Sequence, residues 1–247
     1  MALLLNIESS TEVCSVTLAQ NGTIIQTLEN LIGQNHAMLV TSYIQEIFST
    51  QGLNMNQLDA VAVSGGPGSY TGLRIGVASA KGICYALGIP LIAITSLAAM
   101  SHHVIQNSSD YNLPHDSELL FCPMIDARRM EVYTAIYDRT EKMVREIKAD
   151  IIDQYSYLSY LEKGKVAFFG NGADKCREIL SHPNACFLDR VTTSASYMTT
   201  LSEKAYRDEN FMDIAYYEPY YLKDFVATVP IKNVFKSSQS IDGSTSH

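Results

Sequence analysis

The chain has 247 residues, 47% hydrophobic and 18% charged, which is typical of a globular protein and excludes a disordered one. Its 26 acidic and 18 basic residues give a net charge of −8. This balance argues against unaided nucleic-acid binding, because phosphate neutralisation supplies most of that affinity. The sequence shows neither a signal peptide nor an apolar run long enough to span a bilayer. We expect a soluble cytoplasmic protein without membrane contact.

Five apolar runs of strand length and two helical segments predict the first lobe. The strands are expected at residues 3–7, 13–18, 23–28, 60–64 and 90–94. Asn21 and Gly22 form a hairpin turn between the second and third strands. Helices are expected at 35–50 and 70–87, ended by Gly52 and Gly88. This β-β-β-α-β-α-β order is typical of an α/β domain in which a meander joins parallel strands through helical crossovers.

The second half repeats this order less clearly. Strands are expected at 119–125, 131–138, 143–149 and 166–169. Helices are expected at 155–162, 173–180 and 194–207, with Ser196 as a cap of the last. We therefore expect two related lobes, residues 1–100 and 101–230, with the last helix (about 194–208) packing back on the first lobe. The serine-rich residues 236–247 are expected to be a disordered tail.

The spacing of cysteine and histidine residues predicts no metal site. Five cysteines are an odd number without a CxxC pair, and the six histidines are scattered, with neither HExxH nor HxxxH. A GxSxG elbow is also absent. These patterns favour a protein with no catalytic residues and no bound metal.

An acid and three hydroxyls close the first strand: Glu8, Ser9, Ser10 and Thr11. Such a turn suits a phosphate group or a hydrated cation. Alternatively, its hydroxyls cap their own backbone. A second turn, with Gly65, Gly66, Gly68 and Ser69, leads into the helix at 70–87. It lacks the GxxxxGK[ST] pattern of a Walker loop, so phosphate binding and tight packing both remain open interpretations.

The helix at 70–87 carries a ridge of small residues, Gly72, Gly76, Ala80 and Cys84, at intervals of four. Each glycine weakens a helix by about 1 kcal/mol relative to alanine. Close packing must therefore offset this loss, either against the sheet or against another helix or subunit.

The helix at 35–50 has an apolar stripe that Leu39 and Tyr43 widen to about half its circumference, more than the ~100° that covers a core. We interpret the surplus flank and the ridge as a partner interface. Its expected residues are His36, Leu39, Val40, Tyr43, Ile47, Gly72, Arg74, Ile75, Gly76, Ser79 and Ala80.

Several segments resemble the TsaB (YeaZ) family. The run PGSYTGLRIG at 67–76 matches the family's signature closely, and the opening segment at 5–16 matches its start. Asp126-Ala127-Arg128 and residues 218–222 resemble its second-lobe hairpin and its closing motif. The resemblance covers roughly residues 1–230. It implies an α/β, two-lobed ASKHA fold (actin, Hsp70 and sugar kinases; ribonuclease H-like) with mixed sheets.

The resemblance also implies a non-catalytic subunit of the complex that makes threonylcarbamoyladenosine at position 37 of tRNA. Its partner would be TsaD, which carries a metal on histidines and transfers the threonylcarbamoyl group. The ATPase TsaE joins the complex, and TsaC makes the adenylate donor. Family structures use the two helices described above as the dimer surface, which also forms a homodimer when TsaD is absent. tRNA would be bound only through the complex.

One departure from the superfamily concerns Glu8, where ASKHA enzymes have Asp; the longer side chain argues against nucleotide hydrolysis. Gly170 and Gly172 stand where the adenosine loop would fall, in a segment with few glycines. We interpret all three loops as vestigial nucleotide or phosphate sites. No cofactor is expected, unless a nucleotide binds at the partner interface. The alternative is an independent ASKHA enzyme: a kinase, an ATPase or a glycoprotease-like peptidase.

Overall fold

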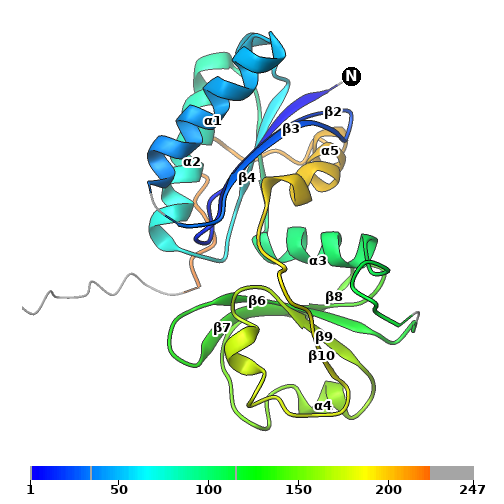
Figure 1. Ribbon diagram of the computed structural model, residues 1–247. Helices are drawn as coiled ribbons and strands as arrows, with labels where there is room; N and C mark the ends of the chain where they lie inside the picture. The colour runs from blue at the N-terminus through cyan, green and yellow to red at the C-terminus, as the bar shows by residue number, and fades with distance from the viewer. Residues whose placement is uncertain (1, 34, 115, 223–247) are drawn as a thin grey trace, which may run out of the picture.

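The structure is a computed structural model that describes residues 2–33, 35–114 and 116–222. Two lobes, each built on a five-stranded mixed sheet, lie one above the other (Figure 1). The tail expected at 236–247 lies outside the described residues. No helix within the described ranges has the length and apolarity needed to cross a bilayer.

The first sheet has the strand order β3-β2-β1-β4-β5. Its strands are β1 (Leu3–Glu8), β2 (Cys14–Gln20), β3 (Thr23–Asn30), β4 (Ala60–Ser64) and β5 (Leu91–Ile94). The first three form an antiparallel meander, and β4 and β5 run parallel to β1. Asn21 and Gly22 have φ of 54° and 76°, the left-handed pair that a tight β2–β3 hairpin turn requires. The strands predicted from the sequence are confirmed.

Two helices, α1 (His36–Gln51) and α2 (Tyr70–Leu87), lie side by side on one face of this sheet (Figure 1). Both end as predicted, at Gly52 and Gly88, which adopt left-handed conformations. The apolar side chains of α1 that face the sheet, among them Val40 and Ile47, are fully buried. On the other face, α5 (Thr199–Arg207) contacts β1 and β5.

The second sheet has the order β10-β9-β6-β7-β8, which repeats the topology of the first. Its strands are β6 (Leu120–Asp126), β7 (Glu131–Tyr137), β8 (Met143–Ile151), β9 (Val166–Phe169) and β10 (Ala185–Phe187). A helix between the lobes, α3 (Ser96–Gln106), packs on β6 (Figure 1). Neither α3 nor β10 was predicted: a lobe boundary was expected where α3 lies, and a three-residue strand leaves little periodicity to read.

Three helices predicted in the second half were too long. The segment 155–162 contains only α4 (Leu158–Leu161), and 173–180 contains a 3-10 turn, η2 (Asp174–Cys176). The last helix begins as a 3-10 turn, η3 (Ala195–Met198), before α5. Its cap is Ser194, whose hydroxyl accepts from the Ser196 amide, and Ser196 is not a cap. Elements as short as α4 and η2 contain about one helical turn, so the sequence pattern does not define where they begin and end.

Candidate functional site

The turn after β1, residues 8–11, is buried against the start of α2. The Ser9 hydroxyl donates to the Gly72 carbonyl at 2.9 Å, and the Ser69 amide donates to the Ser10 carbonyl at 2.6 Å. All four side chains of the turn are at most 7% exposed. The Ser9 hydroxyl and the Ser10 carbonyl are therefore bonded to the start of α2, whereas the Ser10 hydroxyl and one Glu8 carboxylate oxygen are buried without a hydrogen-bond partner among the described residues.

Three glycines, Gly68, Gly72 and Gly76, pack closely against that turn. A Cβ atom on Gly68 or Gly72 would lie 2.2 or 2.1 Å from the carbonyl oxygens of Ser10 and Ser9, and one on Gly76 would lie 2.3 Å from the Ser9 hydroxyl. The small-residue ridge thus faces the β1 turn and the sheet. The ridge therefore does not receive another helix or subunit. Its small residues instead allow close packing within the first lobe.

A C-terminal segment, residues 212–222, covers the other side of the glycine-rich loop; we call it the strap. The Met212 amide donates to the Leu91 carbonyl at 2.8 Å, and the Tyr220 amide donates to the Gly65 carbonyl at 2.8 Å. Gly66 has φ of 93°, and a Cβ there would lie 2.9 Å from the Tyr220 carbonyl oxygen. The loop is therefore enclosed by the chain on both sides.

The second-lobe turn containing Gly170 and Gly172 is also joined to the first lobe. The Asn171 side-chain amide donates to the Glu12 carboxylate at 2.7 Å, and the hydroxyls of Thr11 and Thr193 are hydrogen-bonded at 2.7 Å. The β1 turn is thus bonded to Ser69 and Gly72, and Asn171 joins the second-lobe turn to Glu12, which directly follows the β1 turn. No sequence pattern could have pointed to Glu12 and Thr193, because both contacts join residues from different lobes.

Glu8 lies within this packed region with 1% of its surface exposed. Its carboxylate accepts a hydrogen bond from the Ser10 amide at 2.6 Å. Hydrogen bonds to the carboxylate lower its pKa, but the loss of solvation on burial has the larger effect. The pKa of the Glu8 carboxyl is therefore raised above its ordinary value. Because the folded pKa is raised, the contribution of Glu8 to stability is most favourable at acidic pH and is lost as pH rises through the raised value.

We therefore expect Glu8→Gln to increase the free energy of unfolding at pH 7.5 by on the order of 1 kcal/mol. The neutral amide keeps an acceptor for the Ser10 amide and removes the loss of solvation of a charge. At pH 4 the gain should vanish, because the wild-type carboxyl is then protonated. Urea unfolding across this pH range measures the effect, with the exposed Glu178→Gln as control. An equal difference at every pH would contradict this account of Glu8.

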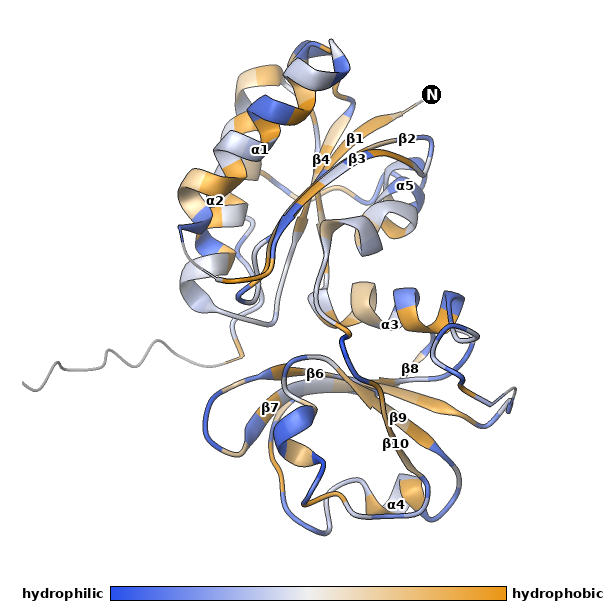
Figure 2. Cartoon of the chain, in the orientation of Figure 1, coloured by the Kyte–Doolittle hydropathy of each residue, from blue (hydrophilic) through white to orange (hydrophobic). Residues whose placement is uncertain are grey.

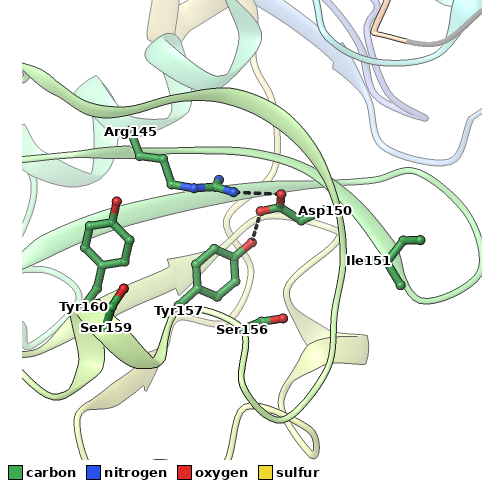
Figure 3. Close-up of a pocket in the computed structure, with 7 residues that line it drawn as sticks. All are labelled: Arg145, Asp150, Ile151, Ser156, Tyr157, Ser159 and Tyr160. Atoms are coloured by element: carbon green, nitrogen blue, oxygen red, sulfur yellow. Dashed lines mark hydrogen bonds and ion pairs between the residues drawn. The ribbon is translucent and has the colours of Figure 1, made fainter.

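No group of three or more His, Cys, Asp or Glu side chains able to hold a metal ion occurs among the residues that the structure describes. A polar cavity of about 260 Å³ lies in the second lobe, beside β8 and α4 (Figure 3). Its Arg145 guanidinium donates to Asp150 at 2.7 Å, and the Tyr157 hydroxyl donates to the same carboxylate at 2.7 Å. These groups bond to each other, so their arrangement matches a structural ion pair.

An apolar groove lies between α1 and α2. Its volume is about 490 Å³. It is lined by Thr41, Ile44, Gln45, Phe48, Met55, Ala78, Ser79, Gly82 and Ile83. Gly82 keeps the groove wide, because no atom lies within 4 Å of where its Cβ would stand. Figure 2 shows the apolar stretches of both helices beside this boundary.

Most of the residues predicted for a partner interface do not line this groove. Buried within the chain are Val40, Ile47, Gly72, Gly76 and Ala80. Leu39 and Tyr43 are half-buried and pack on the first lobe's core together with Ile25 and Leu28 of β3, so the expected surplus flank is not free. His36 is hydrogen-bonded to the Thr11 carbonyl at 2.9 Å.

Three predicted interface residues remain at the outer surface of α2: Arg74 is exposed, and Ile75 and Ser79 are half-buried. Of these, Ser79 lines the groove. The sequence contained one unused signal, since Ala78 and Gly82 are a second pair of small residues at an interval of four. Both are exposed.

Comparison with known proteins places this geometry in a family. The family model of TsaD, tRNA N6-adenosine threonylcarbamoyltransferase, matches residues 28–231. The Haemophilus influenzae tRNA threonylcarbamoyladenosine biosynthesis protein TsaB is 28% identical over 90% of this chain and 94% of its own length. The Escherichia coli protein of the same name is 33% identical over 56% of each chain.

A solved structure, YeaZ from Pseudomonas aeruginosa, superimposes with a TM-score of 0.74 at 23% identity, over 90% of this chain and all of that chain. The likeness confirms the predicted fold class, α/β with two lobes of the ASKHA type. Together with the resemblance at residues 67–76, the matched segments and the shared fold identify the family. The chain belongs to the TsaD family of tRNA N6-adenosine threonylcarbamoyltransferases and, within it, to the TsaB (YeaZ) group.

Proposed function

We propose that this chain is a non-catalytic subunit that binds TsaD through the groove between α1 and α2 and so supports the biosynthesis of threonylcarbamoyladenosine in tRNA. The observation that carries the proposal is the groove itself, an open apolar hollow of about 490 Å³ between α1 and α2. Apolar hollows between helices accept a helix or a bulky side chain from another protein. The names of the H. influenzae and E. coli relatives supply the pathway.

The packing of the loops supports a non-catalytic role. The β1 turn is bonded to the start of α2, and the strap encloses the glycine-rich loop. A nucleotide or phosphate group placed there would have to displace main-chain contacts of the fold. We propose that the remaining chemistry is supplied by TsaD, with the ATPase TsaE binding the assembled complex.

Two further elements of the proposal follow from the surface. A homodimer forms through the same groove in the absence of TsaD, so the homodimer and the TsaD heterodimer exclude each other. tRNA is bound only through the complex, because a net charge of −8 gives this chain little affinity for phosphates by itself.

We expect the purified chain to co-elute with TsaD in size-exclusion chromatography. Threonylcarbamoyladenosine should form in a reconstituted mixture of this chain with TsaD, TsaE and the TsaC product, and not when this chain is left out. Nucleoside mass spectrometry of the tRNA measures the product. ATP or peptide turnover by the isolated chain would instead support the rival, an independent enzyme. Full modification without this chain would refute the proposal.

A further inference from the structure

A second exposed surface continues from the groove across α2 to the strap. Its large side chains are the five tyrosines Tyr70, Tyr85, Tyr216, Tyr220 and Tyr221. Tyr85 on α2 and Tyr216 on the strap are each 85% exposed, and Tyr220 is 49% exposed. Large aromatic side chains seldom gather on a free surface, and tyrosine is enriched where proteins bind each other.

Hydrogen bonds and one ring contact join the strap to α2. The Lys81 ammonium donates to the carbonyls of Ala215 and Tyr217, at 3.4 and 3.0 Å, on either side of Tyr216. Tyr85 follows Lys81 by one helical turn. The rings of Tyr70 and Tyr221 lie 4.9 Å apart. The strap is thus held against α2, so that little main-chain conformational entropy is lost when a partner covers it.

The charges of this surface favour a protein over a nucleic acid as its ligand. The Lys81 ammonium is bonded to the strap carbonyls, and the Arg74 guanidinium lies 4.2 Å from the centre of the Tyr70 ring. The strap adds the acidic residues Asp213 and Glu218. A single-stranded nucleic acid needs a basic track beside its aromatic platform, and these cations are already engaged.

The size of the surface is also appropriate. A stable protein interface covers about 800 Å² on each partner. A fully buried tyrosine contributes about 200 Å², so the exposed parts of Tyr85, Tyr216 and Tyr220 supply roughly 400 Å². These three side chains alone therefore supply about half of the area that a stable interface needs.

We propose that the strap and the outer face of α2 form the second half of the partner-binding surface, on which Tyr85 and Tyr216 are anchor residues. The inference rests on the proposed function, since the occupant is the subunit that enters the groove. The surface fits a protein face that is apolar at its centre and offers hydrogen-bond acceptors at its edge to the tyrosine hydroxyls. The C-terminal strap is then a binding element as well as a cover for the glycine-rich loop.

The test uses Tyr85→Ser, Tyr216→Ser and the double variant, with Tyr155→Ser as matched control. Tyr155 is 68% exposed and lies in the second lobe. Calorimetric titration with TsaD should show each single variant bound at least about 10-fold more weakly than wild type and the double variant weaker still, with the control unchanged. Circular dichroism establishes that all four variants are folded.

Wild-type affinity of the folded double variant would overturn the inference while leaving the proposed function intact. Failure of the wild-type chain to bind TsaD would overturn both. Loss of tRNA binding by the isolated chain in the tyrosine variants, with TsaD affinity unchanged, would assign the surface to RNA and also overturn the inference.

Discussion

Replacing Gly72 by alanine is expected to destabilise the fold by about 3 kcal/mol, although alanine is normally the better helix residue by about 1 kcal/mol. The methyl group would stand 2.1 Å from the carbonyl oxygen of Ser9. That oxygen belongs to the main chain of a buried turn, so it can move only if the turn after β1 leaves its position. The Ser9 hydrogen bond to the Gly72 carbonyl would be lost with it.

Gly82→Ala is the matched control for Gly72→Ala, on the same helix. Gly82 is exposed, and no atom lies within 4 Å of its Cβ position. This substitution should stabilise the protein by up to about 1 kcal/mol through helix propensity alone. Urea unfolding followed by circular dichroism measures both variants. Equal effects of the two substitutions would show that the β1 turn and α2 are not in the contact described here.

The variant Ala78→Arg is expected to weaken binding to TsaD more than 100-fold and to abolish tRNA modification in the reconstituted mixture. Ala78 is exposed and lines the groove, so a long cation there fills the apolar hollow. An unpaired buried charge in an interface opposes binding by several kcal/mol. The fold should be unaffected, because arginine has a high helix propensity and the site is open to solvent.

The control for Ala78→Arg is Ser181→Arg, which adds the same charge at an exposed position of the second lobe. Calorimetric titration with TsaD and nucleoside mass spectrometry should find the control equal to wild type. If the folded Ala78→Arg variant binds TsaD normally, the partner does not use the groove, and the site must be sought on another surface.

The elements of the first lobe could be predicted because their signals are local. Each strand is a short apolar run, and each helix ends at a glycine that can adopt a left-handed conformation. The second lobe was harder, because α4, η2 and β10 have three or four residues each. Elements of that length carry no periodicity and are held by the sheet on which they pack.

The apolar stripe of α1 and the small-residue ridge of α2 could be recognised from the sequence. The segments that pack against them could not. Tyr43 was expected on a free flank, whereas it is half-buried on the core, and Gly76 was expected to meet a partner, whereas it meets Ser9. The residues that decide this are distant: Ser9 and Gly72 are 63 positions apart. Helical periodicity holds no information on contacts of that range, so substitutions at Tyr43 test core packing more than partner binding.

The contact between the β1 turn and α2 has a consequence for the evolution of this chain. Ser9 and Ser10 fit against Gly68, Gly72 and Gly76 so closely that a larger side chain on one segment requires a shift of the other. Substitutions in residues 9–10 should therefore be accompanied by substitutions in residues 68–76 among relatives of this chain. Room for a phosphate would require both segments to move together, so no single substitution in either segment opens it.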